Sequence, residues 1–291
     1  DAWKEGAQNH NFGEGSFSRR RKNALKAYYE WMPIRDTKQK QKIWRDFSVG
    51  NLINLLMLDT RLYGREKQLD ISTYIKNGLL DKKQYKEDLF KPRDLLGKEQ
   101  LNWLDNKVKK TYRWSIFGQQ LLIGPKYLPS IFKSDEFNSS ASSTSQQLAG
   151  EKLAINTDQW DGYPVERQKF YKIISKSQAN IVLAGDSHNS WFSNLYDDDK
   201  NFVGVEIGAP AISSPSLADS YGDFTDIIEK SFIEENDGLI WVNGSYKGYT
   251  SLAIHKDYID VSYKYVSTVK SKDYLSLKPY TFRVEHNKPY T

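Results

Sequence analysis

Residues Asn180–Trp191 read NIVLAGDSHNSW and form the stretch that decides the fold. The apolar run 180–184 predicts a buried strand, and Gly185 allows the backbone to turn sharply after it. Asp186 and His188 follow two positions apart, so in an extended segment their side chains point to the same side. A carboxylate together with an imidazole suits a hydrolytic metal ion, and α/β enzymes place their chemistry at strand ends. The stretch therefore predicts a metal site at the end of a buried strand.

The same stretch allows two other interpretations. Asp186 and Ser187 can simply turn the chain, with His188 as an ordinary polar residue at a strand end. Gly-Asp-Ser is also a pattern of esterases, in which Ser187 would be an acyl-transfer nucleophile. Those enzymes resemble one another in placing this pattern near the start of the domain and an Asp-x-x-His pair near its end. Neither His255 nor His286 has an aspartate three positions earlier, so the esterase interpretation lacks its partner residues.

The composition is that of a globular protein. Among 291 residues, 38% are hydrophobic and 14% are aromatic, which is enough for a sizeable core. The formal net charge of +5 is too small to require a polyanionic partner. Cysteine is absent, which excludes disulfides and thiolate ligands within these residues. No stretch approaches the roughly 20 apolar residues of a membrane helix.

The main local excess of charge is the basic run Arg19–Lys22. It lies in a predicted helix over 17–31, where it is expected to form a solvated outer face. Phosphate steering and nucleic-acid binding are the alternatives. Nucleic-acid binding is the weaker of the two, because the aromatic residues follow core spacing and no recognised binding motif accompanies them. We therefore expect no specific nucleic-acid site.

Alternating strand and helix signals predict an α/β core within one domain over 1–291. The last third changes to an antiparallel pattern, which predicts two packed mixed sheets with helices outside. A Ser-rich stretch over 137–147 has no apolar period and is expected to be a loop. The predicted helices are 17–31, 98–110, 165–175 and 223–234; the predicted strands are 43–49, 52–59, 114–123, 180–185 and 202–207, followed by a meander over 239–266.

Several blocks, taken in order, give the whole chain a family resemblance. They are DAWKEGAQNH (1–10), YYEWMPIR (28–35), LDTR (58–61), LGKEQ (96–100), GQQ (118–120), DQWDGYP (158–164) and GDSH (185–188). Each block alone is a weak signal, but seven in one order are a strong one. The chain resembles the metal-dependent alkaline phosphatase D family of the calcineurin-like metallophosphoesterases. The resemblance implies a four-layer α/β/β/α sandwich and hydrolysis of phosphate monoesters or diesters, with an alkaline optimum, by a metal-activated water.

The resemblance also implies roles for particular residues. Asp186 and His188 match the late metal-binding motif of the family, and the metals expected by analogy are iron and calcium, with manganese and zinc as alternatives. Asp161 could orient a ligand or a water, or it could cap the following helix. Arg61 could grip a phosphate, or it could form a structural ion pair beside Asp59. His10 could lie at the rim of the pocket, or it could be a solvated loop residue.

The chain departs from the family pattern at its start. The earlier metal motifs, a Gly-Asp and an Asp-Asp-His-Glu block, would precede Asp1, so we expect an N-terminally partial sandwich. The general acid is then expected upstream of Asp1, and no catalytic residue is assigned within the chain. The alternative is a non-catalytic binding remnant of the same fold with an incomplete metal centre.

The expected substrates are small-molecule, lipid or nucleotide phosphate esters. The expected state is a monomer without a transmembrane segment. The resemblance implies a periplasmic or extracellular location, although the sequence printed here carries no export signal.

Overall fold

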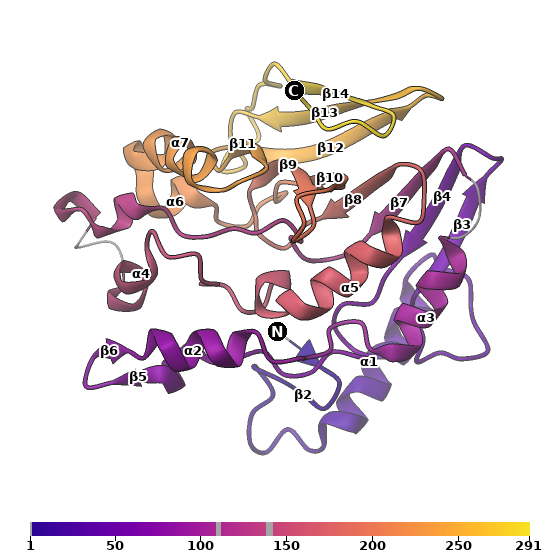
Figure 1. Ribbon diagram of the computed structural model, residues 1–291. Coiled ribbons are helices and arrows are strands. Elements are labelled where there is room, and N and C mark those ends of the chain that lie inside the picture. The colour runs from indigo at the N-terminus through magenta and orange to yellow at the C-terminus, as the bar shows by residue number, and fades with distance from the viewer. Residues whose placement is uncertain (1, 109–111, 138–141) are drawn as a thin grey trace.

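A seven-stranded mixed sheet forms the centre of the molecule (Figure 1). The computed structural model describes residues 2–108, 112–137 and 142–291. Across the sheet the strand order is β11-β9-β10-β8-β7-β4-β3. The strands are β3 Arg45–Val49, β4 Ile53–Met57, β7 Trp114–Gly118, β8 Asn180–Ala184, β9 Ser190–Tyr196, β10 Phe202–Gly208 and β11 Leu239–Asn243. The central strands β7 and β8 are almost fully buried, as apolar runs covered on both faces of a sheet are.

Four neighbouring strands of this sheet, β4, β7, β8 and β10, run parallel. Met57 at the end of β4 lies opposite Gly118 of β7, which in turn lies opposite Leu183 of β8. These strands therefore end level with one another. The carboxyl ends of parallel strands meet at one edge of a sheet, so the loops after β4, β7 and β8 converge there.

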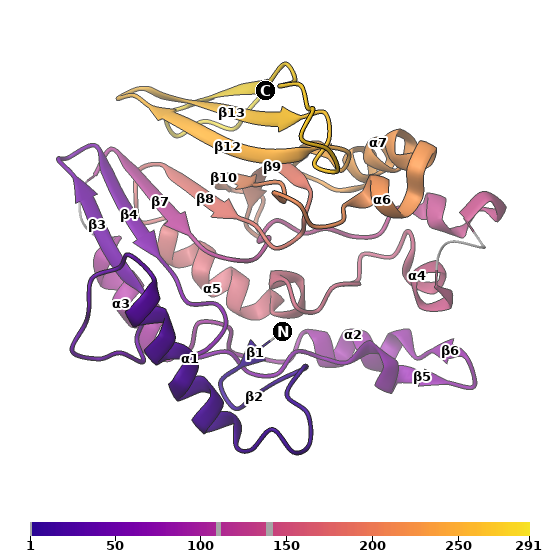
Figure 2. The same ribbon diagram turned by 180° about the vertical axis from the view of Figure 1, so that it is seen from behind.

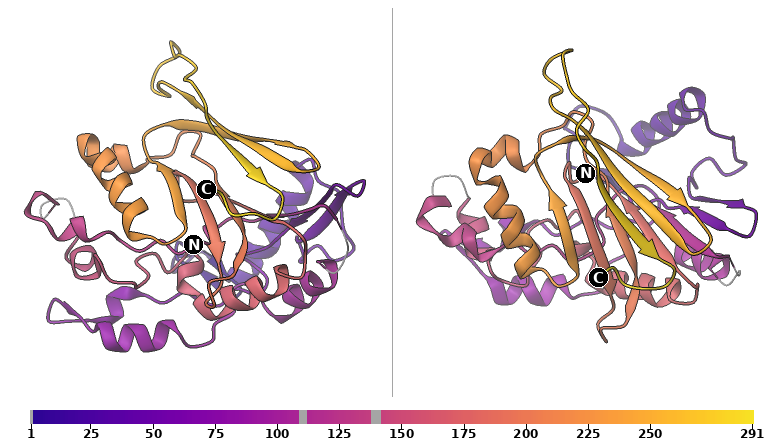
Figure 3. Two further views of the ribbon diagram at one scale, coloured as in Figure 1. Left: turned by 45° about the horizontal axis from the view of Figure 1, so that its top comes forward. Right: turned by 90° about the horizontal axis from the view of Figure 1, so that it is seen from above.

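A second, antiparallel sheet lies on one face of the central sheet (Figures 2 and 3). It consists of β12 Lys247–Ile254, β13 Tyr258–Val266 and β14 Tyr280–Glu285, in that order. Ile259 and Val261 of β13 pack with Ile181 and Val205 of the central sheet in one apolar core. Burial alternates along β13, because one face of this sheet is covered and the other is open.

Helices cover the opposite face of the central sheet (Figure 1). The helix α3 spans Lys98–Lys107 and α5 spans Pro164–Ile174. Phe170 and Ile174, four positions apart on α5, pack with Phe117 and Val182 of the sheet. At the other end of the sheet, α6 Leu217–Tyr221 and α7 Thr225–Glu235 pack near β11.

Shorter elements surround this core. They are the hairpin strands β1 Ala2–Trp3 and β2 Gly6–Ala7, α1 Phe17–Trp31, β5 Ile75–Lys76, β6 Leu79–Leu80, α2 Lys82–Leu89, α4 Ser143–Leu148, and 3₁₀ turns at Ile71–Tyr74, Ser130–Lys133, Asp135–Phe137, Trp160–Gly162 and Gly222–Phe224. Ser16 caps the start of α1, because its hydroxyl accepts the N–H of Arg19. No helix within the described ranges is long and apolar enough to cross a membrane.

The structure confirms the predicted α/β fold with a mixed sheet. The predicted four-layer sandwich corresponds to three layers over the part of the chain that the structure describes, where no helix covers the outer face of the three-stranded sheet. That outer face is polar: the Arg283 guanidinium binds the Asp260 carboxylate there at 2.7 and 2.9 Å. A polar outer face is what a sheet with one solvated side requires.

Two strand predictions are wrong: one strand is shorter than predicted, and the strands of the predicted meander do not all pair with one another. The strand predicted over 114–123 ends at Gly118, because the N–H groups of Leu122 and Ile123 bind the side chains of Gln159 and Glu206 instead of a neighbouring strand. The meander predicted over 239–266 is divided between the sheets. Its first strand, β11, pairs with β9 in the central sheet, whereas β12 and β13 form the hairpin of the second sheet.

Some elements of the main sheets and one helix were not predicted from the sequence patterns. The strands β9 and β14 were not predicted, and α4 forms within the stretch predicted to be a loop. Of that stretch, 138–141 lie outside the described residues, as do the last positions of the helix predicted over 98–110. The strand β9 carries buried Ser193 and Asn194 between its aromatic residues, which hides its apolar character.

A buried carboxylate ties α5 to the start of α3. Glu166 is fully buried, and its Oε1 atom accepts the N–H groups of Leu95, Leu96 and Gly97 at 3.0, 2.6 and 3.3 Å. Within the described residues, its Oε2 atom has no hydrogen-bond partner of good geometry. Burial raises the pKa of Glu166 to about 7, against the opposing effect of these N–H groups.

This pKa shift makes stability depend on pH. In the native state Glu166 keeps its proton up to about pH 7, whereas the unfolded chain loses it near 4.5. The native state therefore binds more protons between these values, and we expect the free energy of unfolding to fall as pH rises through this window. In Glu166→Gln, the free energy of unfolding measured with urea should no longer fall with pH between about 4.5 and 7 on account of this group. The variant Glu30→Gln, at an exposed position, should keep the pH dependence of the wild type. If Glu166→Gln and the wild type show the same pH dependence of the free energy of unfolding, the raised pKa of Glu166 is contradicted.

Candidate functional site

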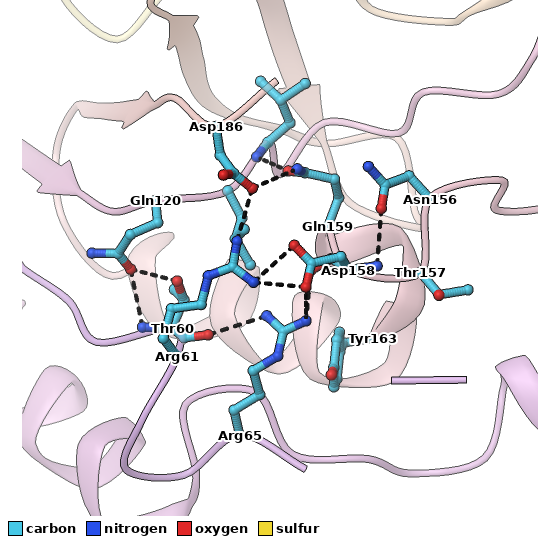
Figure 4. A network of polar contacts seen from close by, with 12 residues as sticks. Thr60, Arg61, Arg65, Gln120, Asn156, Thr157, Asp158, Gln159, Tyr163 and Asp186 are labelled. Atoms are coloured by element: carbon cyan, nitrogen blue, oxygen red, sulfur yellow. Dashed lines mark hydrogen bonds and ion pairs between the residues drawn. The ribbon is translucent and has the colours of Figure 1, made fainter. Parts of the chain in front are cut away.

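A polar cluster lies where three loops of the central sheet meet at its carboxyl edge (Figure 4). The loop after β4 supplies Thr60 and Arg61, the loop after β7 supplies Gln120, and the loop after β8 supplies Asp186. The Arg61 Nη2 atom donates to Asp186 Oδ2 at 2.8 Å. The level ends of the parallel strands bring these two residues together, although 125 positions separate them.

Arg61 lies between two carboxylates. Its Nη1 atom donates to Oδ1 and Oδ2 of Asp158 at 2.6 and 2.8 Å, while its Nη2 atom donates to Asp186. Gln159 also donates to Asp186 Oδ2, at 3.3 Å. The side chain of Asp158 is 11% exposed and that of Asp186 is 41% exposed. The cluster therefore opens to solvent on the side of Asp186 and is closed on the side of Asp158.

A second arginine holds Asp158 from the buried side. Arg65 is fully buried, and its Nη2 atom donates to Asp158 Oδ1 at 2.7 Å and to the Asp158 carbonyl oxygen at 2.9 Å. Its guanidinium lies 5.0 Å from the ring centre of Tyr163. Burial lowers the pKa of Arg65, and the charge of Asp158 acts in the opposite direction. Asp158 is thus the shared counter-ion of two guanidinium groups.

The loop that carries Arg61 is held by its own backbone contacts. The buried carboxylate of Asp59 accepts the N–H groups of Arg61, Leu62 and Tyr63 at 2.9, 2.9 and 3.0 Å. A Cβ atom at Gly64 would lie 2.0 Å from the Leu96 carbonyl oxygen, so only glycine allows this close approach. Arg61 does form the ion pairs that the structural alternative expects, but with Asp158 and Asp186, because the Asp59 carboxylate is taken up by backbone N–H groups.

The turn after β8 differs from the extended segment that the sequence predicts. The strand ends at Ala184, and both Asp186 and His188 have a φ of 64°, in the left-handed region. Asp and His adopt this region more readily than most residues, and such strain concentrates at functional sites. Ser187 Oγ accepts the Trp191 indole N–H at 2.8 Å, and no described hydrogen bond joins it to a histidine. This geometry gives the esterase interpretation no support.

His188 presents one ring nitrogen to a protein partner. Its Nδ1 atom lies 2.9 Å from the Pro215 carbonyl oxygen, which can only accept, so Nδ1 is the donor and, in the neutral ring, Nε2 has the lone pair. A metal-ligating histidine is commonly oriented in this way. Asp186 and His188 are both exposed and offer one carboxylate and one imidazole. Within the described ranges, no group of three or more His, Cys, Asp or Glu side chains is placed to hold a metal ion.

Asp161 lies in a different environment from the one its predicted ligand role requires. Its side chain is buried, Oδ1 accepts from Arg167 at 2.5 Å, and Oδ2 accepts the N–H of Lys126 at 3.0 Å. Both oxygens therefore have protein partners. These contacts favour the structural alternative, in which Asp161 orders the start of α5.

His10 is held within the N-terminal loop. Its Nε2 atom lies 3.0 Å from the Gly15 carbonyl oxygen, and Nδ1 lies 3.2 Å from Arg20 and 3.3 Å from Glu14. None of the described contacts joins His10 to the Arg61 cluster. The predicted rim position therefore has no direct support in these contacts.

Sequence reasoning missed Asp158, Arg65 and Gln159 as members of the cluster. Asp158 and Gln159 open the block DQWDGYP at 158–164, but their position before a helix entry suggested no partner. Arg65 lies in a charged segment that reads as surface. The one available signal was their place in the ordered family blocks, because no local pattern predicts an ion pair across 93 positions.

Comparisons with known proteins agree with this architecture. A family model described as PhoD-like phosphatase matches residues 1–263. Alkaline phosphatase D of Bacillus subtilis (strain 168) is 32% identical over 251 residues, which cover 82% of this chain and 37% of that protein. A solved structure described as "Structure of PhoD" has a TM-score of 0.70 and 24% identity, over 98% of this chain and 50% of that one. The chain thus spans half or less of the length of these relatives, and the structural likeness concerns the fold.

The shared carboxylate predicts an unequal effect of two aspartate substitutions. Asp158→Ala leaves the buried Arg65 without its counter-ion, and we expect a loss of about 3–5 kcal/mol in the free energy of unfolding. Asp260→Ala breaks the exposed pair with Arg283 and should cost much less. Urea unfolding of both variants measures the difference, and equal losses would contradict the role of Asp158.

Proposed function

We propose, from the premise that this chain belongs to the PhoD-like phosphatase family, that it serves in hydrolysis of phosphate esters at the Arg61–Asp186 cluster. The observation that carries the proposal is the contact of Arg61 with Asp186 at the carboxyl edge of the sheet. At this edge α/β proteins bind their ligands. The relative Bacillus subtilis alkaline phosphatase D supports the reaction class.

Asp186 and His188 are proposed as metal ligands. A carboxylate oxygen and the free Nε2 atom of His188 are donors that hydrolytic metals accept, and both side chains reach solvent. The family resemblance suggests iron and calcium, with manganese or zinc as alternatives. A metal bound there would acidify a water and neutralise charge on the phosphoryl oxygens.

Arg61 is proposed as the phosphate-binding residue. Its guanidinium is planar, and both carboxylate oxygens of Asp158 hold the Nη1 atom, which leaves the Nη2 side to meet a phosphate oxygen. The other side, Nη2, faces Asp186 at the open side of the cluster. An ester phosphate that entered from the side of Asp186 would meet the Arg61 guanidinium in an orientation that Asp158 has already fixed. Orientation fixed before binding lowers the entropic cost of reaching the reactive geometry.

Several wider features remain part of the proposal. The substrates are phosphate monoesters or diesters of small molecules, lipids or nucleotides. The protein is proposed to act as a monomer outside the cytoplasm. These points rest on the family resemblance.

Substitution of the two proposed ligands tests the metal assignment. In the full-length protein, Asp186→Ala and His188→Ala should each lower kcat/KM on monoester and diester substrates by more than the roughly 10- to 100-fold typical of an outer-shell change. Bound metal, measured by elemental analysis, should fall in parallel. His255→Ala is the control, because its ring stacks on Tyr258 in the β12–β13 hairpin. Unchanged rates and metal content in both variants would exclude the assignment.

The phosphate-binding role of Arg61 predicts a different pattern. Arg61→Lys keeps the charge but loses the planar guanidinium, so we expect kcat/KM to fall about tenfold or more with bound metal unchanged. Arg283→Lys, in the exposed pair with Asp260, is the matched control. If the full-length wild type turns over neither ester class, the alternative of a non-catalytic binding module holds instead.

A further inference from the structure

The segment between β10 and α6 packs against the turn that carries His188. The Ala211 N–H donates to the His188 carbonyl oxygen at 3.4 Å, and the Leu217 N–H donates to Asn189 Oδ1 at 3.0 Å. Between these contacts lies the Pro215 carbonyl oxygen, 2.9 Å from His188 Nδ1. The direction of the imidazole ring therefore depends on where this segment is held.

Lys247, the first residue of β12, holds the segment at the residue after Pro215. Its Nζ atom donates to Ser216 Oγ at 2.5 Å and to Asp219 Oδ2 at 2.9 Å. Asp219 Oδ2 also accepts the N–H and the hydroxyl of Ser216, at 2.9 and 3.1 Å. Both Lys247 and Ser216 are buried. The anchor formed by these three side chains therefore lies directly beside the carbonyl group that His188 binds.

The other end of the segment is tied to the same strand. The N–H of Gly248, the second residue of β12, donates to the Ala211 carbonyl oxygen at 3.0 Å. A Cβ atom at position 248 would lie 1.9 Å from the Lys264 carbonyl oxygen, so only glycine allows this strand to lie so close. Two adjacent residues of β12 thus hold both ends of a segment that forms no helix or strand of its own.

The buried ammonium of Lys247 supplies direction as well as charge. Lysine is seldom buried unless a counter-ion accompanies it, and Asp219 is that counter-ion. An apolar side chain at position 247 would fill the same space but would donate no hydrogen bond to Ser216 Oγ. The position of Ser216, and with it that of the preceding carbonyl group of Pro215, therefore depends on the ammonium.

We propose that Lys247 is a positioning residue for His188: through Ser216 it holds the Pro215 carbonyl oxygen against Nδ1–H and so keeps Nε2 unprotonated, the state that a metal ligand requires. The inference rests on the proposed function, because it takes His188 as a metal ligand. A neutral imidazole can carry its proton on either nitrogen, and the hydrogen bond that one nitrogen makes decides between them. Lys247 acts through Ser216 and Pro215, and its own hydrogen bonds go to Ser216 and Asp219.

Proton–nitrogen NMR of the histidine side chains tests the proposal in the metal-free, full-length protein at alkaline pH, where a free imidazole is neutral. The signals of His188 are identified by their loss in His188→Gln. The wild type should show the Nδ1–H form, and Lys247→Met should show a substantial share of Nε2–H. Lys264→Met is the matched control, because Lys264 is an exposed lysine of the neighbouring strand β13 whose ammonium lies over Tyr249.

A second pair of variants separates positioning from a general loss of structure. Ser216→Ala removes the hydroxyl between Lys247 and Pro215 but keeps the ion pair of Lys247 with Asp219, so it should also increase the Nε2–H form. Ser216→Thr keeps a hydroxyl and should restore the Nδ1–H form. If Lys247→Met does not fold, the comparison of Ser216→Ala with Ser216→Thr decides.

Zn²⁺ binding to the metal-depleted, full-length protein provides a further readout that is independent of turnover. The Kd for Zn²⁺ should rise about 10- to 100-fold in Lys247→Met and in Ser216→Ala, as loss of an outer-shell partner predicts, and should stay unchanged in Lys264→Met.

The outcomes distinguish this inference from the proposed function. An unchanged His188 tautomer in folded Lys247→Met and Ser216→Ala would overturn the inference and leave the proposed function standing. The same holds for an unchanged Kd in these variants when His188→Ala itself weakens Zn²⁺ binding. If His188→Ala leaves Zn²⁺ binding unchanged, the proposed metal role of His188 fails, and a tautomer that follows Lys247 still supports the positioning.

Discussion

The placement of one carboxylate between two guanidinium groups is the interaction on which the candidate site depends. Asp158 accepts from Arg61 through both oxygens and from the fully buried Arg65 through Oδ1. A buried cation requires a counter-ion, so the burial of Arg65 depends on Asp158. Arg65 in turn donates to the Thr60 carbonyl oxygen, beside Arg61. The ion pair of Arg65 with Asp158 therefore holds the loop after β4 in place and sets the direction in which the Arg61 side chain extends.

The sheet determines where that arginine points. Because β4, β7 and β8 are parallel and end level with one another, the loops after them form a single edge, and Asp186 lies within hydrogen-bonding reach of Arg61. Gln159 links the same edge to the loop before α5, since its side-chain Nε2 donates to Asp186 and its side-chain Oε1 accepts the N–H of Leu122. Hydrogen bonds to the backbone and to mostly buried side chains therefore hold the cluster in place. Rigid support of this kind keeps a site arranged before a ligand arrives.

Some parts of this structure were predictable from sequence and others were not. The strand β8 and the helix α1 follow local patterns closely, because a continuous apolar run and a helical spacing of apolar residues are local signals. The strand β9 was hidden by its buried Ser193 and Asn194, whose burial depends on neighbours that only the folded sheet provides. Asp186 and His188 were recognisable as candidate ligands from their residue types. Their left-handed backbone was not, since the pattern reads equally well as an extended segment.

By itself, the sequence determined the fold class, the family resemblance and the identity of Asp186, His188 and Arg61 as candidates, because these depend on residue types and on order along the chain. Tertiary structure alone decided which candidates share a site. It placed Arg61 against Asp158 and Asp186, and it assigned Asp161 to an ion pair with Arg167. The physical reason is that ion pairs form across distances in space, which the parallel sheet sets. Spacing along the chain contains little information about contacts between residues about a hundred positions apart.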